Sequence, residues 1–241
     1  MRGGWIPDLP DKRDLLYKQV KKSVSIPDFV DLRLFCSPIE DQETIGSCTA
    51  QALVANIELL RIKNENKPFE DLSRLFLYYE TRKLEFSINQ DSGAMLRTGI
   101  KALNNTGVCP ESLWPYYVSK FRKKPTPKCY EEAIKRRIVS YHRILSLGEM
   151  LNCLTEGYPF VFGFSMYSGF DKVAKTGVAE MPKKSEYSNG GHAVMAVGFD
   201  KKKEVFIVRN SWGIKWGDKG YFTMPFEYLE TLADDFWVIK S

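Results

Sequence analysis

The residue best placed for covalent chemistry in this sequence is Cys48, at the start of a predicted helix. Apolar residues follow it at helical spacing, while Gly46 allows a sharp turn into the helix and Ser47 is a candidate N-cap. A thiol on the first turn of a helix faces the positive end of the helix dipole, which favours the thiolate. Cys48 is therefore a candidate nucleophile, although a small buried cysteine would show the same pattern.

The base has few candidates, because the chain contains two histidines, His142 and His192. His192 precedes a predicted strand, 193–199, which a lysine-rich turn joins to a second strand, 205–209. If this hairpin is symmetrical about its turn, opposite residues have numbers that sum to about 402, and His192 faces Asn210. An asparagine oxygen there would bind one imidazole nitrogen and leave the other able to accept a proton. A shift of one residue in the register would separate the two side chains.

Cys48, His192 and Asn210 together supply what covalent acyl transfer requires: a nucleophile, a base and a residue that orients the base. The nucleophile lies in the first quarter of the chain and the base in the last, so we expect them to meet between two lobes. Taken singly, His192 and Asn210 would fit an ordinary strand end and an ordinary turn. The combination of the three residues is what favours catalysis.

Composition restricts the other functions that the chain could have. Its 241 residues permit one large domain or two lobes around a cleft, and 44% of them are hydrophobic. The net charge of +5 is scattered over short lysine clusters with no basic and aromatic face, which argues against nucleic-acid binding. The longest apolar run, 158–167, is about half of a membrane span, and the N-terminus lacks the apolar core of a signal peptide. We therefore expect no membrane partner and an intracellular location.

The five cysteines do not form a metal-binding pattern. Their number is odd, so at least one thiol is unpaired within the chain, and in a reducing compartment we expect most to be free. Whether any two of the cysteines other than Cys48 are bridged stays open. These are Cys36, Cys109, Cys129 and Cys153.

The order of the predicted elements indicates an α+β fold with two lobes. The first lobe, about 26–132, is mostly helical, and the second, about 133–241, is mostly antiparallel strand. Residues 1–25 form a separate N-terminal extension, in which Pro7 and Pro10 disfavour helix. The predicted helices are 48–64, 73–84, 94–103 and 147–154, and the predicted strands are 138–144, 159–166, 193–199 and 205–209.

Three motifs resemble the papain family of cysteine peptidases. They are Gln42 with Gly46-Ser47-Cys48, the run Gly190-Gly-His192-Ala-Val, and the run Asn210-Ser-Trp212-Gly-Ile-Lys-Trp216-Gly-Asp-Lys-Gly220-Tyr. The resemblance extends from about Ile26 to the C-terminus, and the Asn-Ser-Trp-Gly run is its most specific part. It implies a papain-like fold, with a helical lobe, a β-barrel-like lobe and the active-site cleft between them. It also implies a peptidase, expected to be an endopeptidase, that needs no metal or cofactor.

The resemblance implies a role for five residues. Cys48 is the nucleophile, His192 is the general acid and base, and Asn210 orients His192. Trp212 shields the hydrogen bond between His192 and Asn210 from water. Gln42 donates its side-chain amide to the oxyanion, together with the backbone N–H of Cys48.

The expected substrate is a peptide or protein that lies extended along the cleft. A glycine-rich edge hydrogen-bonds its backbone, and an apolar pocket, to which Phe164 contributes, receives the second residue before the cut bond. Ordinary core packing would suit the pocket residues equally well. The expected substrate-binding residues are Ser92, Gly93, Met95, Leu96, Gly191 and Trp212.

The chain departs from the usual family pattern without losing a catalytic group. Ile45 and Asp91 stand where a disulfide-bonded pair is usual. Thr49 replaces a common tryptophan, and Gly191 replaces a frequent aspartate. These features resemble the disulfide-poor members found in bacteria, archaea and large DNA viruses, which extends the expected location to the virion.

The N-terminal extension is much shorter than the helical propeptides of the family. We hypothesise that residues 5–10 lie extended over the cleft and lower activity until they are displaced or cut; an arm packed behind one lobe is the alternative. Two other functions stay open. One is a transamidase that uses the same thioacyl intermediate, and the other is a non-catalytic papain-fold binding protein, against which the presence of all four catalytic groups argues.

We expect Cys48→Ala to abolish hydrolysis of a fluorogenic peptide and to leave the fold intact, because the sulfur is required for the covalent step. His142→Ala serves as the control and should leave the rate nearly unchanged. Alkylating reagents should reach Cys48 before the other four cysteines. First labelling at Cys109 or Cys129 would contradict the assignment of the nucleophile.

Overall fold

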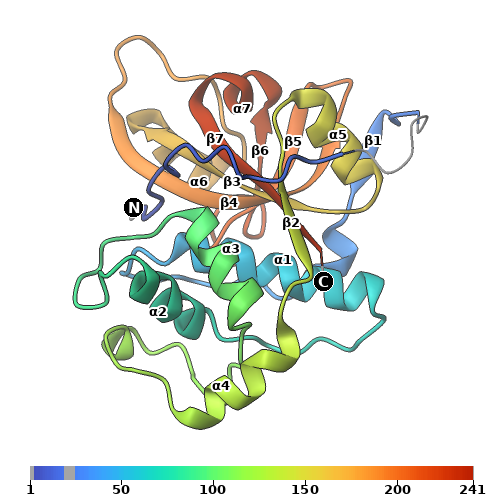
Figure 1. Cartoon of the computed structure of the whole chain (residues 1–241). Coiled ribbons are helices and arrows are strands. Elements are labelled where there is room, and N and C mark those ends of the chain that lie inside the picture. The colour runs from blue at the N-terminus through green and yellow to red at the C-terminus, as the bar shows by residue number, and fades with distance from the viewer. Residues whose placement is uncertain (1–2, 19–24, 241) are drawn as a thin grey trace.

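The first four helices lie in one half of the molecule, and the sheet lies in the other half together with the later helices, as Figure 1 shows for the computed structural model, which describes residues 3–18 and 25–240. One half contains α1 to α4, and the other contains a seven-stranded antiparallel sheet, so the predicted α+β architecture is confirmed. The helices are α1 (Cys48–Asn64), α2 (Arg74–Leu84), α3 (Leu96–Asn105), α4 (Pro127–Ala133), α5 (Leu147–Thr155), α6 (Val173–Thr176) and α7 (Phe226–Leu232). The strands are β1 (Phe29–Asp31), β2 (Ser140–Arg143), β3 (Phe160–Tyr167), β4 (Ser188–Asp200), β5 (Val205–Arg209), β6 (Tyr221–Pro225) and β7 (Ala233–Lys240).

The central helix of the molecule is α1. Every residue from Cys48 to Leu60 is buried, so the helix is covered on all sides rather than along one stripe. It packs against β4 in the sheet half and against α2 and α3 in the helical half. Gly99 of α3 allows this close packing, because a Cβ there would lie only 2.6 Å from the Leu53 Cδ1 atom. The first turn of α1 is therefore held between the two halves.

The strands follow the order β2-β7-β3-β4-β5-β6, and β1 pairs with β4 outside this path. The sheet thus takes one strand from the part of the chain that precedes α1. Strand β4 begins five residues earlier than the predicted 193–199, because its first residues pair with β3 rather than with β5. The boundaries of α1, α2, α5 and β3 agree with the prediction within one residue.

The predicted register of the β4–β5 hairpin is wrong. Met195 lies opposite Arg209 and Asp200 opposite Val205, so the paired numbers sum to 404 and 405 rather than to 402. The connection is a four-residue turn, 201–204, and the register shifts once more between Ala196 and Gly198. An irregularity inside a strand has no clear signal in the sequence, and it moves every residue beyond it.

The N-terminal residues form an extended arm, which we define as residues 3–18. Figure 1 shows this blue segment crossing the sheet half just above α3. Trp5 forms a parallel bridge with Ala94, and Leu16 forms one with Arg143 of β2. The arm therefore contacts the segment that leads into α3 and the edge strand of the sheet, two regions far apart in the sequence.

Candidate active site

The three residues of the predicted catalytic set come from three elements that meet where α1 touches β4. Cys48 is the first residue of α1, His192 lies within β4, and Asn210 directly follows β5. Their relative exposures are 0%, 0% and 3%, so water has no access to the centre in this structure.

The predicted contact between His192 and Asn210 is present, although the strand register that suggested it is not. The His192 Nε2 atom lies 2.8 Å from the Asn210 Oδ1 atom. The backbone N–H of Ser211 also donates to this oxygen, at 2.8 Å, which identifies the oxygen as the acceptor. Nε2 therefore carries a hydrogen, and in the neutral ring Nδ1 does not. Nδ1 is buried and has no hydrogen-bond partner in the described part of the chain.

Trp212 covers this hydrogen bond. Its ring stacks on the His192 ring with 4.4 Å between centroids and 25° between planes. The Trp212 Nε1 atom donates to the Gln42 Oε1 atom at 3.2 Å. The indole thus connects the base to the residue expected in the oxyanion hole.

Gln42 is held in a defined orientation by its side-chain oxygen. That oxygen accepts from the Ser211 hydroxyl at 2.8 Å as well as from Trp212. The amide nitrogen therefore points the other way and donates to the Ile45 carbonyl oxygen at 3.1 Å. Gln42 is fully buried, and its backbone N–H donates to the Ser211 carbonyl at 2.8 Å.

The thiol and the imidazole are both held in their neutral forms. Burial raises the pKa of Cys48 to about 12, although nearby backbone N–H groups, among them those of Ala193 and Trp5, oppose the shift. Burial also lowers the pKa of His192 to about 4, and the hydrogen bond with Asn210 acts in the opposite direction. The helix dipole that favours the thiolate is outweighed by the loss of solvent around the sulfur.

One local prediction around Cys48, the capping role of Ser47, is wrong. Ser47 is not a side-chain cap of α1, because its hydroxyl lies 2.7 Å from the Tyr116 hydroxyl instead. At the place where the family usually has a disulfide, the Asp91 Oδ1 atom accepts from the backbone N–H of Gly46 at 2.9 Å. It also accepts from the Tyr78 hydroxyl at 2.7 Å. A polar link thus connects the segments at this point, and all five cysteines are free.

Several of the expected substrate-binding residues lie against the arm. The Gly191 carbonyl oxygen accepts from the backbone N–H of Gly4 at 2.9 Å, and Gly93 approaches Gly4 so closely that a Cβ would lie 2.1 Å from its oxygen. Met95 directly follows Ala94, whose N–H donates to the Gly4 carbonyl at 2.8 Å. The edge expected to bind a peptide backbone is therefore occupied by the arm.

The other expected binding residues differ in their surroundings. Leu96 is fully buried at the start of α3, and Ser92 is exposed, with its hydroxyl near that of Ser87 at 3.0 Å. Phe164 packs into an aromatic cluster with Phe170 and Tyr228. It does so because alternate residues of β3 face opposite sides and Gly163, not Phe164, faces the arm.

Sequence reasoning missed two residues that contact the arm near the centre, Gly163 and Asp235. A Cβ at Gly163 would lie 1.9 Å from the Trp5 indole. The Asp235 Oδ2 atom accepts from the Trp5 Nε1 atom at 3.1 Å. No local pattern marks them, since each acquires its role only from the position of the arm.

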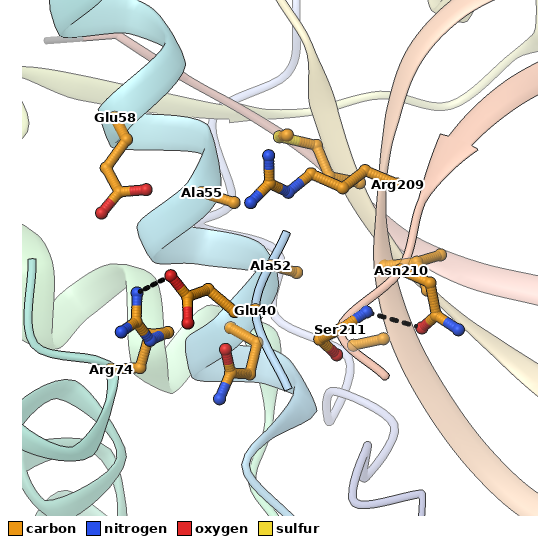
Figure 2. Close-up of a pocket in the computed structure, with 12 residues that line it drawn as sticks. Glu40, Ala52, Ala55, Glu58, Arg74, Arg209, Asn210 and Ser211 are labelled. Atoms are coloured by element: carbon orange, nitrogen blue, oxygen red, sulfur yellow. Dashed lines mark hydrogen bonds and ion pairs between the residues drawn. The ribbon is translucent and has the colours of Figure 1, made fainter. Parts of the chain in front are cut away.

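A buried polar cluster lies behind Asn210, as Figure 2 shows. Arg209, the residue before Asn210, donates to the carbonyl oxygens of Ser37 and Pro38 at 2.6 and 2.5 Å. The cluster surrounds a small cavity of about 10 Å³ that Asn210 also lines. Burial raises the pKa of Glu58, on α1, to about 7. These contacts hold the end of β5, and hence Asn210, against the helical half.

The geometry of the site agrees with a comparison of sequences. The chain matches the papain family of cysteine proteases over residues 26–230. It belongs to this family. As a papain-family enzyme it is a thiol-dependent protease, and its similarity to known members extends over nearly its whole length.

Relatives of this papain-family chain occur in viruses, protists, plants and bacteria. It is 43% identical to an uncharacterized peptidase C1-like protein of Acanthamoeba polyphaga mimivirus, over 99% of this chain and 86% of that protein. It is 30% identical to cysteine proteinase 2 of Entamoeba histolytica, over 85% of this chain and 65% of that protein. Among solved structures, xylellain, a cysteine protease from Xylella fastidiosa, superimposes with a TM-score of 0.93. The two are 43% identical over 99% of this chain and 96% of that one.

The described residues contain neither a group of side chains suited to a metal ion nor a helix suited to cross a membrane. Within residues 3–18 and 25–240, no three His, Cys, Asp or Glu side chains are grouped so that they could hold a metal ion. Among the helices of the same residues, none combines the length and apolar character that crossing a membrane requires.

We expect iodoacetamide to label Cys48 of the intact chain slowly near about pH 8, because the thiol is buried and its pKa is about 12. The rate should keep rising, by about tenfold for each pH unit, since the thiolate is the reactive form. Cys36, which is only half-buried, is the internal control when the labelled peptides are mapped by mass spectrometry. Because Cys48 is buried, we expect Cys36 to be labelled before it, which is the reverse of the order expected from the sequence. A plateau in the Cys48 labelling rate below about pH 9 would contradict the raised pKa of this thiol.

Proposed function

We propose that this chain hydrolyses peptide bonds through a covalent thioacyl intermediate on Cys48, with His192 as the acid and base. The observation that carries the proposal is the state of the His192 ring. Its Nε2–H is held by Asn210, so Nδ1 is the nitrogen that can accept a proton, and Nδ1 has no other partner among the described residues. The thiol lies beside the backbone N–H of Ala193, the residue after His192.

The reaction then proceeds in two stages. The Cys48 thiol gives its proton to Nδ1 of His192, and the sulfur attacks the carbonyl carbon of the substrate. His192 returns the proton to the departing amine as the C–N bond breaks and the thioester remains. His192 next takes a proton from water, whose oxygen attacks the thioester, and the acid product leaves as the thiol re-forms. Asn210 keeps the ring in the tautomer that both stages require.

Gln42 is proposed to stabilise the oxyanion with its side-chain N–H, together with the backbone N–H of Cys48. Its amide oxygen is already occupied by Ser211 and Trp212, which directs the nitrogen away from them. Substrate would draw this nitrogen from the Ile45 carbonyl, a local contact at 3.1 Å.

We expect Gln42→Ala to lower kcat by about 100- to 1000-fold, because one donor to the oxyanion is lost. Because Gln42→Glu retains an acceptor for Ser211 and Trp212 but replaces the N–H donor, it should be similarly slow. The matched control is Gln90→Ala, because Gln90 is exposed and is not part of the proposed catalytic set. Steady-state kinetics with a fluorogenic peptide measure the effect. A kcat within twofold of the parent would remove Gln42 from the mechanism.

We further propose that the N-terminal arm, by occupying the cleft, keeps the peptidase inactive. Support comes from the contacts of Gly4 and Trp5. Gly4 hydrogen-bonds both Gly191 and Ala94, on opposite sides of the cleft, and the backbone N–H of Trp5 lies near the thiol. A peptide substrate needs the same backbone groups.

An ionic cluster anchors the arm farther along the chain. The Asp8 carboxylate, fully buried, accepts from Trp237 Nε1 at 2.9 Å and from Arg143 Nη2 at 3.1 Å. The Asp14 carboxylate accepts from Arg97 Nη2 at 2.6 Å and from Arg143 Nε at 3.1 Å. Buried charges that are paired in this way resist separation, because either partner left alone would be poorly solvated.

We expect Trp5→Ala in the full chain, and a chain that begins at Ile26, to hydrolyse peptides faster than the parent and to label faster at Cys48. The reason is that water and substrate would reach the thiol, and the pKa of Cys48 would fall towards its ordinary value. Leu9→Ala, an exposed arm residue, is the control. Equal peptidase rates for all four proteins would eliminate the arm as an inhibitor.

A further inference from the structure

The Trp5 indole occupies a site whose walls are two glycines. A Cβ on Gly163 would lie 1.9 Å from the indole, and one on Gly191 would lie 2.6 Å from it. At the polar end, the Trp5 Nε1 atom donates to the Asp235 Oδ2 atom at 3.1 Å. We call the surroundings formed by Gly163, Gly191 and Asp235 the indole site.

The strand register explains why these residues form one site. Gly163 of β3 lies opposite Ala193 of β4, and Ser165 lies opposite Gly191. Because side chains alternate along a strand, residues 163, 191 and 193 face the same side of the sheet. His192 faces the other side. The small residues at adjacent positions on this face leave room for a large ring next to β4, the strand that contains His192.

The Asp235 carboxylate makes the indole site selective for a side chain that donates a hydrogen bond. Asp235 is 1% exposed, and its Oδ1 atom accepts from Arg143 Nη2 at 3.0 Å. Its Oδ2 atom accepts from Trp5 Nε1 and from the backbone N–H of Asp8, at 3.1 and 2.7 Å. Both donors to Oδ2 belong to the arm. When the arm leaves, this oxygen loses both, and an occupant with an N–H group would restore one.

We propose that the indole site selects the substrate: it takes a tryptophan side chain, with Gly163 setting the size and Asp235 recognising the indole N–H. This inference rests on the proposed peptidase function, and it assigns the arm the role of an internal copy of the preferred ligand. Trp5 bridges Ala94, the residue before Met95, so the arm holds Trp5 at the edge of the cleft expected to bind a peptide.

Binding tests the proposal without catalysis. The protein is the full chain with Trp5→Ala and Cys48→Ala, and the ligands are acetyl-Ala-X-Ala-amide peptides with Trp, Phe or Val at X. We expect the Trp peptide to bind at least about tenfold more tightly than the Phe peptide in isothermal titration calorimetry, since only Trp donates to the buried carboxylate. Equal affinities for the three peptides would overturn the proposal.

Two added substitutions separate the contributions of size and hydrogen bonding. Gly163→Ala should abolish the Trp preference and leave Val binding within about twofold, because the new Cβ fills the ring position. Asp235→Asn should reduce the Trp advantage over Phe to near one. The Asn oxygen would stay with Arg143, which can only donate, and the amide N–H would then face the indole N–H. Asn also tolerates the positive φ of 56° at this position. An unchanged Trp advantage in Asp235→Asn would refute the role of the carboxylate.

A milder variant tests the same contact in the otherwise native chain. Trp5→Phe retains the ring but lacks the N–H, so we expect Cys48 labelling to quicken by about tenfold relative to the parent. A labelling rate equal to that of the parent would count against the Asp235 contact.

Hydrolysis distinguishes the two proposals from each other. Trp5→Ala with Cys48 intact should cleave the peptides acetyl-Ala-X-Ala-Ala-Ala-amide, after the alanine that follows X, with the highest kcat/KM when X is Trp. Cleavage without preference among Trp, Phe and Val would refute the selectivity and leave the peptidase function standing. Selective binding of Trp without cleavage of any peptide would support the indole site and refute the proposed hydrolysis.

Discussion

The packing of α1 against β4 is the contact on which the rest of the molecule depends. It places the Cys48 thiol, from the first quarter of the chain, beside the backbone N–H of Ala193, the residue that follows His192. Neither element could form the site alone. The N-terminus of a helix contributes only the positive end of the helix dipole, and a strand contributes only a fixed position for a side chain. The buried cluster around Arg209 then ties the following residue, Asn210, to the same junction. The residues of the proposed catalytic set therefore come together only where the two halves of the molecule meet.

The burial that encloses the proposed catalytic residues also shifts the pKa values of the thiol and the imidazole. A thiolate and an imidazolium both require solvent or a partner charge, and the covered centre supplies neither in full. The pKa of the thiol therefore lies above its ordinary value and that of the imidazole below. Removing the arm would expose the cleft without altering any bond within the catalytic set.

The sequence was informative wherever a feature is local or repeats with a period. Helical spacing located α1 and α2, and the motifs predicted Cys48 and His192 as the nucleophile and the base. The strand register failed because a four-residue turn and an irregularity between Ala196 and Gly198 add up to a shift that no local pattern reveals. The roles of Gly163 and Asp235 were likewise hidden, since they depend on a tryptophan more than 150 residues away in sequence. The sequence did show that Gly191 departs from the family pattern, and the structure supplies a reason: an aspartate would collide with the Trp5 ring.

The ionic anchor of the arm makes the docking of the arm depend on pH. Burial, and then the neighbouring Asp235, raise the pKa of Asp8 from its ordinary 3.8 to about 6. The docked arm consequently takes up a proton near pH 6 that a detached arm would not bind until near pH 4. Through this carboxyl, mild acid therefore favours the docked arm over the detached arm.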